Sequence, residues 1–213
     1  MPENLRAQPS PTAAVDSIFL LRLLAEANPK NHPVGAVKPN KWTYLVNRSC
    51  AEDGVQAFRY SFVKDKLGPV SQQVYSDLGR LAASGLITED HSVTPRGREF
   101  LETAKEFFEA NSGLTQIVDQ VARKYGAYSR VRLVDFVHSL KVPQDDKMVS
   151  IDSVPMGVRL LSPADRPVAT HLNIGEDWLE TFEILLDPES SADLASARED
   201  IQRGRVRLLP SDG

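Results

Sequence analysis

The sequence predicts a mainly helical α+β fold, and three observations carry that prediction. Apolar residues recur every three or four positions over most of the chain, which is the period of an amphipathic helix. Alternation of apolar and polar residues, which indicates a strand, is confined to short stretches such as residues 58–62. With 213 residues, of which 41% are hydrophobic, the chain is long enough to bury a sizeable core.

The charge of the chain is unevenly distributed along its length. Residues 1–140 carry 17 Lys and Arg against 15 Asp and Glu, whereas residues 141–213 carry 8 against 14. The most acidic stretch, residues 176–193, holds seven acidic residues and no Lys or Arg. Such a segment attracts a basic partner and repels nucleic acid.

The cysteine content and the hydropathy pattern predict where the protein resides. A single cysteine, Cys50, excludes an internal disulfide and any site with several cysteine ligands, so we expect it to be a small buried residue. The apolar runs are short and the N-terminus lacks a signal pattern, which predicts neither a membrane span nor secretion. We therefore expect a cytoplasmic protein.

The first part of the chain predicts two helices and a strand. Residues 1–12 hold three prolines and few apolar residues, and we expect a disordered lead. A helix is predicted from Thr12 until Asn28-Pro29, and a second helix has Pro39 in its first turn. The alternation over residues 58–62 predicts a strand.

The segment GPVSQQVYSDLGRLAASGLI, residues 68–87, predicts the next helix. Pro69 suits its first position and Gly85 suits its end. Leu86-Ile87 and Val93 then flank a short hairpin, and Thr94-Pro95 begin another helix as cap and first-turn proline. Helix, two-stranded wing and helix follow one another as in a winged helix-turn-helix.

The rest of the chain predicts helices and one hairpin. One helix ends at Gly126 and another starts at Ser129, and residues 154–161 and 168–175 are expected to pair as a hairpin. Asp187-Pro188 separates two amphipathic helices, which a strand RVRLL follows. The predicted organisation is a lead (1–12), a winged-helix domain (13–140), a linker with a β-hairpin (141–175) and a partner-binding C-terminal segment of amphipathic helices (176–213).

The exposed face of the helix over residues 68–87 is the candidate DNA-binding surface. Glutamines can hydrogen-bond adenine edges in the major groove, but a single Arg gives little neutralisation of phosphates. The wing adds the carboxylates of Glu89 and Asp90. Operator DNA is therefore a candidate partner. A homodimer, or a complex with another protein, would bind it more tightly than a monomer does. The candidate DNA-binding residues are Ser71, Gln72, Gln73, Ser76 and Arg80.

Three stretches together carry a family resemblance. The runs FRYSFVKDKLGPVSQQVYSDLGRLAASGLI, VTPRGREFL and VARKYGAYSRVRLVDFVHSL resemble the YwgA-type and Panacea (SocA-like) winged-helix group. The matching features are Gly68-Pro69 with Tyr75, and Tyr125-Gly126 with Leu133, within about residues 13–140. The resemblance implies a winged helix and a role among the antitoxins of toxin–antitoxin pairs.

The tail carries a second resemblance. The run WLETFEILLDPESSADLASAREDIQRGRV is similar to the C-terminal toxin-binding segment of Phd/YefM-type antitoxins, with its ETLE-L-DPE and DI-GRV pattern. This similarity implies that the tail binds a basic protein toxin. The apolar pattern leaves a second interpretation open, in which the same helices pack on the chain's own core. The residues assigned to the toxin are Trp178, Leu179, Phe182, Leu185, Leu186, Leu194, Ile201, Arg205 and Val206.

Motifs of catalysis are not found in the sequence. The four histidines are scattered without metal-ligand spacing, and no nucleophile elbow, P-loop or dinucleotide fingerprint occurs. We expect no enzymatic activity, no catalytic residue, no metal and no cofactor. Two functions remain: an antitoxin that neutralises a basic toxin and represses their shared promoter, or a free-standing winged-helix regulator with a C-terminal dimerisation or ligand domain. A small basic reading frame next to the gene favours the first.

Overall fold

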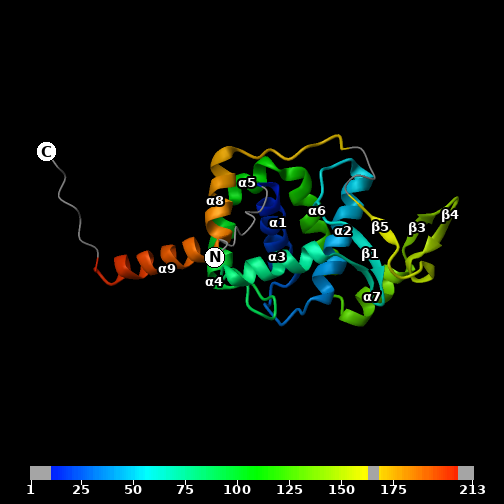
Figure 1. The fold of residues 1–213 in the computed structure, drawn as a ribbon, viewed down its shortest axis with the longest axis horizontal. Coiled ribbons are helices and arrows are strands. Elements are labelled where there is room, and N and C mark those ends of the chain that lie inside the picture. Colours follow the sequence, from blue (N-terminus) through cyan, green and yellow to red (C-terminus); the bar gives the residue numbers. More distant parts are fainter. Residues whose placement is uncertain (1–10, 163–167, 206–213) are drawn as a thin grey trace, which may run out of the picture.

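The computed structural model describes residues 11–162 and 168–205, which form a mainly helical α+β architecture with two small antiparallel sheets (Figure 1). Helix α1 (Pro11–Ala27) lies at the centre. Between Val15 and Leu24 seven of its ten residues are apolar and buried, while Arg22 and Glu26 reach the surface, so the helix is buried on most of its sides. The predicted helix from Thr12 to Asn28 is confirmed.

Helix α2 (Val37–Asp53) has Pro39 in its first turn, as predicted. The strand that comes next is shifted: β1 covers Phe62–Asp65 and pairs with β2 (Gly68–Val70), whereas residues 58–61 form no strand. Side chains satisfy the backbone there, because the Asn47 amide donates to the carbonyl of Phe58 (2.9 Å) and Gln73 accepts from the N–H of Ser61 (2.8 Å). The predicted strand over residues 58–62 is therefore wrong by several residues.

The Gly-Pro pair belongs to β2 and not to a helix. Pro69 pairs with Lys64 of β1, and Ser71 is the residue before helix α3 (Gln72–Ala83). Gly68 has a φ of +91°, and a Cβ there would lie 3.0 Å from the ring of His138, so glycine is required for the turn into β2. The prediction that Pro69 opens the helix is wrong for this reason.

The expected wing is reduced to one bridge between Ile87 and Val93. Thr94 caps helix α4 (Pro95–Thr103) as predicted, since its hydroxyl accepts from the N–H of Gly97 at 3.1 Å. The apolar run after it forms two helices, α4 and α5 (Lys105–Ala110), with Ala104 between them.

The next two helices meet where the sequence indicates. Helix α6 (Ser112–Tyr125) stops at Gly126, and Ser129 caps α7 (Arg130–Ser139) by accepting from the N–H of Arg132 at 3.2 Å. Both predictions are confirmed.

A hairpin of β3 (Lys141–Gln144) and β4 (Lys147–Ser150) extends from the body, followed by the 3-10 turn η1 (Ile151–Ser153) (Figure 1). Strand β5 (Arg159–Leu161) joins the other sheet, whose order is β2-β1-β5, and Thr170 forms a parallel bridge with Val55. The predicted hairpin of residues 154–161 with 168–175 is therefore wrong, because each half pairs with an earlier part of the chain.

The C-terminal helices are α8 (Glu176–Leu186) and α9 (Pro188–Gln202), which separate at Asp187 as predicted. The apolar core is continuous from α1 to α8 and includes Ile151 and Phe182 from beyond the predicted boundaries at residues 140 and 175. Cys50 is buried in this core, as expected, and burial raises its pKa to about 12. Most of the predicted strand RVRLL and the lead over residues 1–10 lie outside the described residues. No helix of the described chain is long and apolar enough to cross a bilayer.

Candidate functional site

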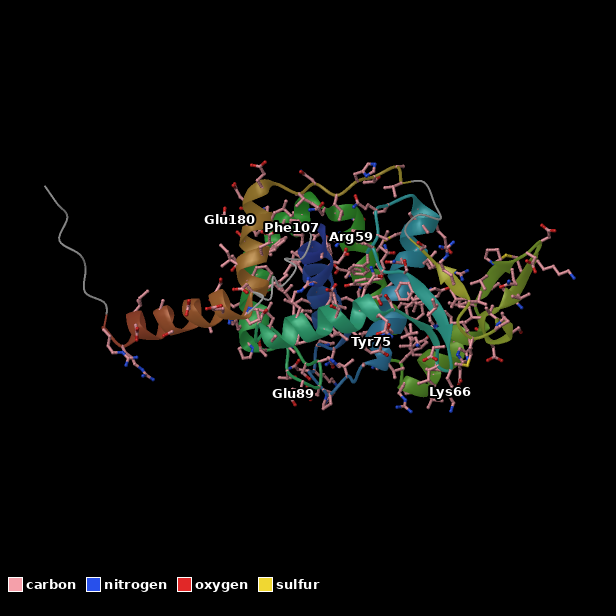
Figure 2. The ribbon with its side chains drawn as sticks, viewed as in Figure 1. Arg59, Lys66, Tyr75, Glu89, Phe107 and Glu180 are labelled. Carbon is pink, nitrogen blue, oxygen red and sulfur yellow. The ribbon has the colours of Figure 1, made fainter. Side chains whose placement is uncertain are left out.

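Helix α8 packs against the chain's own core through its aromatic face. Phe182 is fully buried, and its ring centre lies 4.9 Å from that of Phe107 and 5.9 Å from that of Phe100. The ring of Trp178 lies 5.8 Å from Phe107, which Figure 2 labels beside α8. The assignment of this apolar face to a toxin is therefore wrong for α8, because the chain's own core covers it.

Three leucines of α8 also pack against the core of the chain. Leu186 is buried, and its carbonyl accepts from the hydroxyl of Ser84 at 3.0 Å. Leu179 and Leu185 are partly buried against the same core. The interpretation that the sequence left open, a helix packed on its own domain, describes α8. The residues assigned to the toxin that instead pack against the body are Trp178, Leu179, Phe182, Leu185 and Leu186.

The segment before α8, residues 168–175, is here called the strap, and hydrogen bonds tie it to the body. The N–H groups of Ala169 and Thr170 donate to the carbonyl of Gly54 at 2.8 and 3.0 Å. The side chain of Asn111 accepts from the N–H of Asn173 (2.7 Å) and donates to its carbonyl (2.9 Å). The strap therefore fixes where α8 begins.

Helix α9 differs from α8 because it points away from the body (Figure 1). Asp187 caps it by accepting from the N–H of Ser190 at 2.8 Å. None of its described side chains is buried, and Ile201 is 65% exposed. Arg205, also assigned to the toxin, forms an ion pair with Asp200 at 2.8 Å. The side chain of Leu194 and all of Val206 lie outside the described part of the chain.

Carboxylates occupy the solvent side of α8 and continue into α9. Glu176, Asp177 and Glu180 are exposed, and Figure 2 labels Glu180 on this helix. Ile184, which is 42% exposed, lies among them. The outer face of α8 is therefore acidic with one exposed apolar side chain, and it leads directly to the projecting α9.

The α3 surface does not present the side chains that were assigned to DNA. Ser71 is buried, and the Gln73 side chain hydrogen-bonds the backbone of Ser61 and Arg59. Arg80 turns toward the body, where it pairs with Asp77 at 3.4 Å and donates to Ser17 at 3.3 Å.

Only Gln72 and Ser76 of the five remain exposed without such contacts, beside Tyr75, which Figure 2 labels. The exposed face of α3 thus carries no charge. The wing next to it presents the exposed carboxylates of Glu89 and Asp90. The assignment of Ser71, Gln73 and Arg80 to a base-reading surface is wrong, because intramolecular contacts use all three side chains.

A buried polar cluster joins α1, α3 and the residues before β1. Tyr60 donates to Asp77 at 2.7 Å, and Arg59 pairs with Asp16 at 2.9 Å. Burial raises the pKa of Asp16 to about 7 against the opposing effect of Arg59, and burial also raises the pKa values of Asp77 and Tyr60. Sequence reasoning missed this cluster, although Asp16 is the one acidic residue in the largely apolar part of its helix, residues 13–25. Asp16, Asp77 and Tyr60 are buried in the core, whereas Arg59 is partly exposed and also lines a pocket of about 250 Å³, so the cluster joins the packing of the core to the protein surface.

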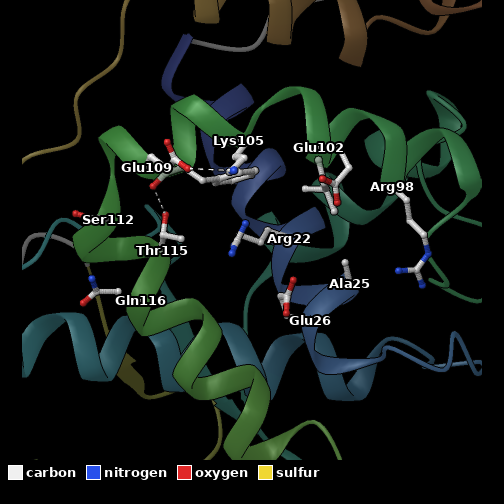
Figure 3. A pocket seen from close by; sticks show the side chains of 12 residues that line it. Arg22, Ala25, Glu26, Arg98, Glu102, Lys105, Glu109, Ser112, Thr115 and Gln116 are labelled. Atoms are coloured by element: carbon white, nitrogen blue, oxygen red, sulfur yellow. Dashed lines mark hydrogen bonds and ion pairs between the residues drawn. The ribbon is translucent and has the colours of Figure 1, made fainter.

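A surface pocket of about 530 Å³ lies between α1, α4, α5 and α6 (Figure 3). Arg22 lies over the ring of Phe108 at 4.7 Å and pairs with Asp119 at 2.9 Å, and Lys105 pairs with Glu109 at 3.7 Å. Since its cations and carboxylates largely neutralise one another, the pocket favours no particular ligand charge.

Comparison of the chain with protein-family models, with curated proteins and with solved structures finds no match. Among the described residues, no group of three or more His, Cys, Asp and Glu side chains could hold a metal ion. Function is therefore inferred from the sequence motifs and from the geometry of the molecule.

Proposed function

We propose that the chain is an antitoxin, a non-enzymatic protein that binds and blocks a basic protein toxin with α9 and the residues after it. The observation that carries the proposal is the projecting α9, of which no described side chain is buried. An isolated helix of about 15 residues is only marginally stable in water, so contact with a partner would stabilise it. The similarity of the tail to Phd/YefM-type antitoxins supports the same segment.

The acidic side of α8 supports a basic partner. Residues 176–193 hold no Lys or Arg, and three of the four acidic side chains of α8 are exposed to solvent. Helices α8 and α9, residues 176–202, are here called the acidic arm. Complementary charge accelerates the encounter of two proteins, and apolar anchors then supply affinity. In this proposal α8 attracts the toxin, while Leu194, Ile201 and the segment that includes Val206 bind it.

We further propose that residues 13–140 are a winged-helix scaffold that carries this arm. The order of two helices, the β1–β2 hairpin, α3, the Ile87–Val93 bridge and α4 supports the assignment, together with the resemblance to the Panacea group. The fold alone does not imply DNA binding. The uncharged face of α3 gives no support to the reading of operator DNA by that helix.

Co-expression tests the proposal. Each gene adjacent to the coding sequence is expressed alone and together with this chain, and growth and co-purification are measured. We expect one small basic neighbour to arrest growth and this chain to restore it by binding. The proposal fails if no neighbour is toxic, or if growth is restored without a complex, in which case the free-standing regulator becomes the better interpretation.

A matched pair of variants locates the binding helix. Ile201→Asp on α9 should abolish co-purification and growth rescue, because a charge replaces an apolar anchor at the interface. Met156→Asp introduces the same charge at a residue of similar exposure, 64% against 65%, in the turn between η1 and β5, and should behave as wild type. Equal loss in both variants would contradict the assignment to α9.

A further inference from the structure

The turn between α6 and α7 gathers positive charge on a surface that the proposed function does not use. The chain from residue 120 to residue 134 contains four cations and no Asp or Glu. All four are exposed, and none forms an ion pair with any residue that the structure describes. This surface is here called the α6–α7 corner, and its cations are Arg123, Lys124, Arg130 and Arg132.

Aromatic rings hold the corner together. The rings of Tyr125, Tyr128 and Phe136 pack at 5.0 to 6.2 Å from one another. The Nζ of Lys124 lies 5.2 Å from the ring centre of Tyr125, and the guanidinium of Arg132 lies 4.0 Å from that of Tyr128. The two cations are thus placed by neighbouring rings instead of by carboxylates.

Helix α2 braces the corner from behind. The Nζ of Lys38 donates to the carbonyl of Gly126 at 3.2 Å and lies 4.9 Å from the ring of Trp42, whose indole N–H donates to the carbonyl of Tyr125. These contacts hold the peptide between α6 and α7 rigid. The corner is therefore preorganised, and little conformational entropy is lost when a ligand binds.

The start of α7 adds to the positive potential. Ser129 satisfies the N–H of Arg132, while the first N–H groups of a helix have no partner within it and carry a partial positive charge. Arg130 and Arg132 stand in this first turn, where a cation is unfavourable in the free protein. A bound anion would relieve that repulsion, and phosphate suits both the helix N-terminus and the guanidinium groups.

The acidic parts of the molecule do not cover this surface. Figure 1 places α7 and α8 at opposite sides, so the acidic arm lies far from the corner. The nearest carboxylates along the chain are Asp119, which pairs with Arg22, and Asp135, one turn after Arg132. A local cationic surface therefore persists although the net charge of the chain is −4.

We propose that the α6–α7 corner binds the phosphate backbone of duplex DNA independently of sequence. Cations and helix N–H groups recognise phosphates, whereas binding of a single strand depends on free aromatic faces on which bases stack. Here Lys124 and Arg132 lie over the faces of Tyr125 and Tyr128, so the corner offers charge and not a stacking platform. This inference does not depend on the antitoxin proposal.

Fluorescence anisotropy with the full-length chain and a labelled duplex of arbitrary sequence tests the inference. We expect binding whose affinity falls steeply from about 0.05 M to about 0.2 M salt. Arg123→Gln with Arg130→Gln should weaken binding at least tenfold at low salt and reduce the salt slope by about 2, because two phosphate contacts are lost. These two residues make none of the ring contacts that hold the corner, so thermal stability should stay unchanged.

A matched control removes the same charge elsewhere. Arg98→Gln with Lys105→Gln lowers the net charge equally on the α4–α5 surface and should leave DNA binding intact. Equal losses in the two double variants would show that net charge alone is measured and would overturn the proposal. Absence of duplex binding by the wild type, or tighter binding of a single strand of the same length, would overturn it as well.

Discussion

At the scale of single residues, Asp16 shows how strongly the core constrains an ionisable group. Its carboxyl, on helix α1, is buried in the core and pairs with Arg59. Burial outweighs the effect of this ion pair and raises the pKa of Asp16 to about 7. Between about pH 4 and pH 7 the folded chain retains a proton that the unfolded chain has lost. The contribution of Asp16 to the free energy of unfolding therefore falls as the pH rises through this window.

Asp16→Asn should remove that dependence. We expect urea denaturation to give a smaller decrease in the free energy of unfolding between pH 4 and pH 7 for the variant than for the wild type, by up to about 1.4 kcal/mol per pH unit. Ile18→Val changes the same helix without removing a titrating group and should keep the wild-type slope. Identical slopes for all three proteins would show that Asp16 does not titrate in this range.

Substitutions of Phe182 on α8 and of Ile201 on α9 should affect stability differently, because the first side chain is buried and the second is exposed. Phe182→Ala leaves a cavity against Phe100 and Phe107, and we expect a loss of about 3–5 kcal/mol in the free energy of unfolding. Ile201→Ala removes an exposed side chain and should change stability by less than about 0.5 kcal/mol. Chemical denaturation measures both, and a small effect of Phe182→Ala would mean that α8 is not part of the cooperative core.

At the scale of elements, local signals in the sequence located helix ends better than strand partners. Thr94 and Ser129 act through hydrogen bonds within a few residues of themselves, so their roles as caps could be predicted. Gly126 ends α6 as expected, but a Cβ there would meet the carbonyl of Ala27, a contact between distant segments that the sequence did not reveal. The pairing of Leu161 with Phe62, and of Thr170 with Val55, joins residues about 100 positions apart. No short-range pattern encodes such a pairing, and the predicted hairpin was wrong for that reason.

The candidate binding residues show the same limit. The sequence pattern showed the apolar stripe of α8 and the polar face of α3, but it did not show which residues these surfaces contact. Whether Phe182 meets a partner or Phe107, and whether Arg80 meets a phosphate or Asp77, depends on contacts between distant segments. The four cations of the α6–α7 corner lie close together in the sequence, but the rings that place two of them belong to contacts that the sequence alone did not reveal.

Truncation tests α8 and α9 as separate elements. A chain that ends at Asp187 loses only the projecting helix and the residues after it, so its melting temperature should stay close to that of the wild type while toxin binding is lost. A chain that ends at Gly175 also loses Phe182 and Leu186 and should be strongly destabilised or insoluble. Calorimetry of both chains decides this, and equal melting temperatures would contradict the docking of α8.

At the scale of the whole molecule, charge is separated along the protein. The acidic arm lies opposite the cationic α6–α7 corner (Figure 1), so the chain has a marked electrostatic polarity. We expect the association rate with a basic toxin to fall at least tenfold from about 0.01 M to about 1 M salt, while the dissociation rate changes little. Stopped-flow mixing measures the two rates, and an association rate independent of salt would exclude attraction by the arm.

The position of α8 against α1 also has a consequence for how the chain is made. Helix α1 ends at Ala27 and α8 begins at Glu176, so the ribosome adds about 150 residues between a central helix and the helix that covers it. At ordinary rates of elongation this interval is on the order of ten seconds. The rings of Phe100 and Phe107, which are made about halfway through this interval, then remain uncovered until α8 leaves the ribosome, so the emergence of α8 is the step that buries them and ends their exposure to aggregation.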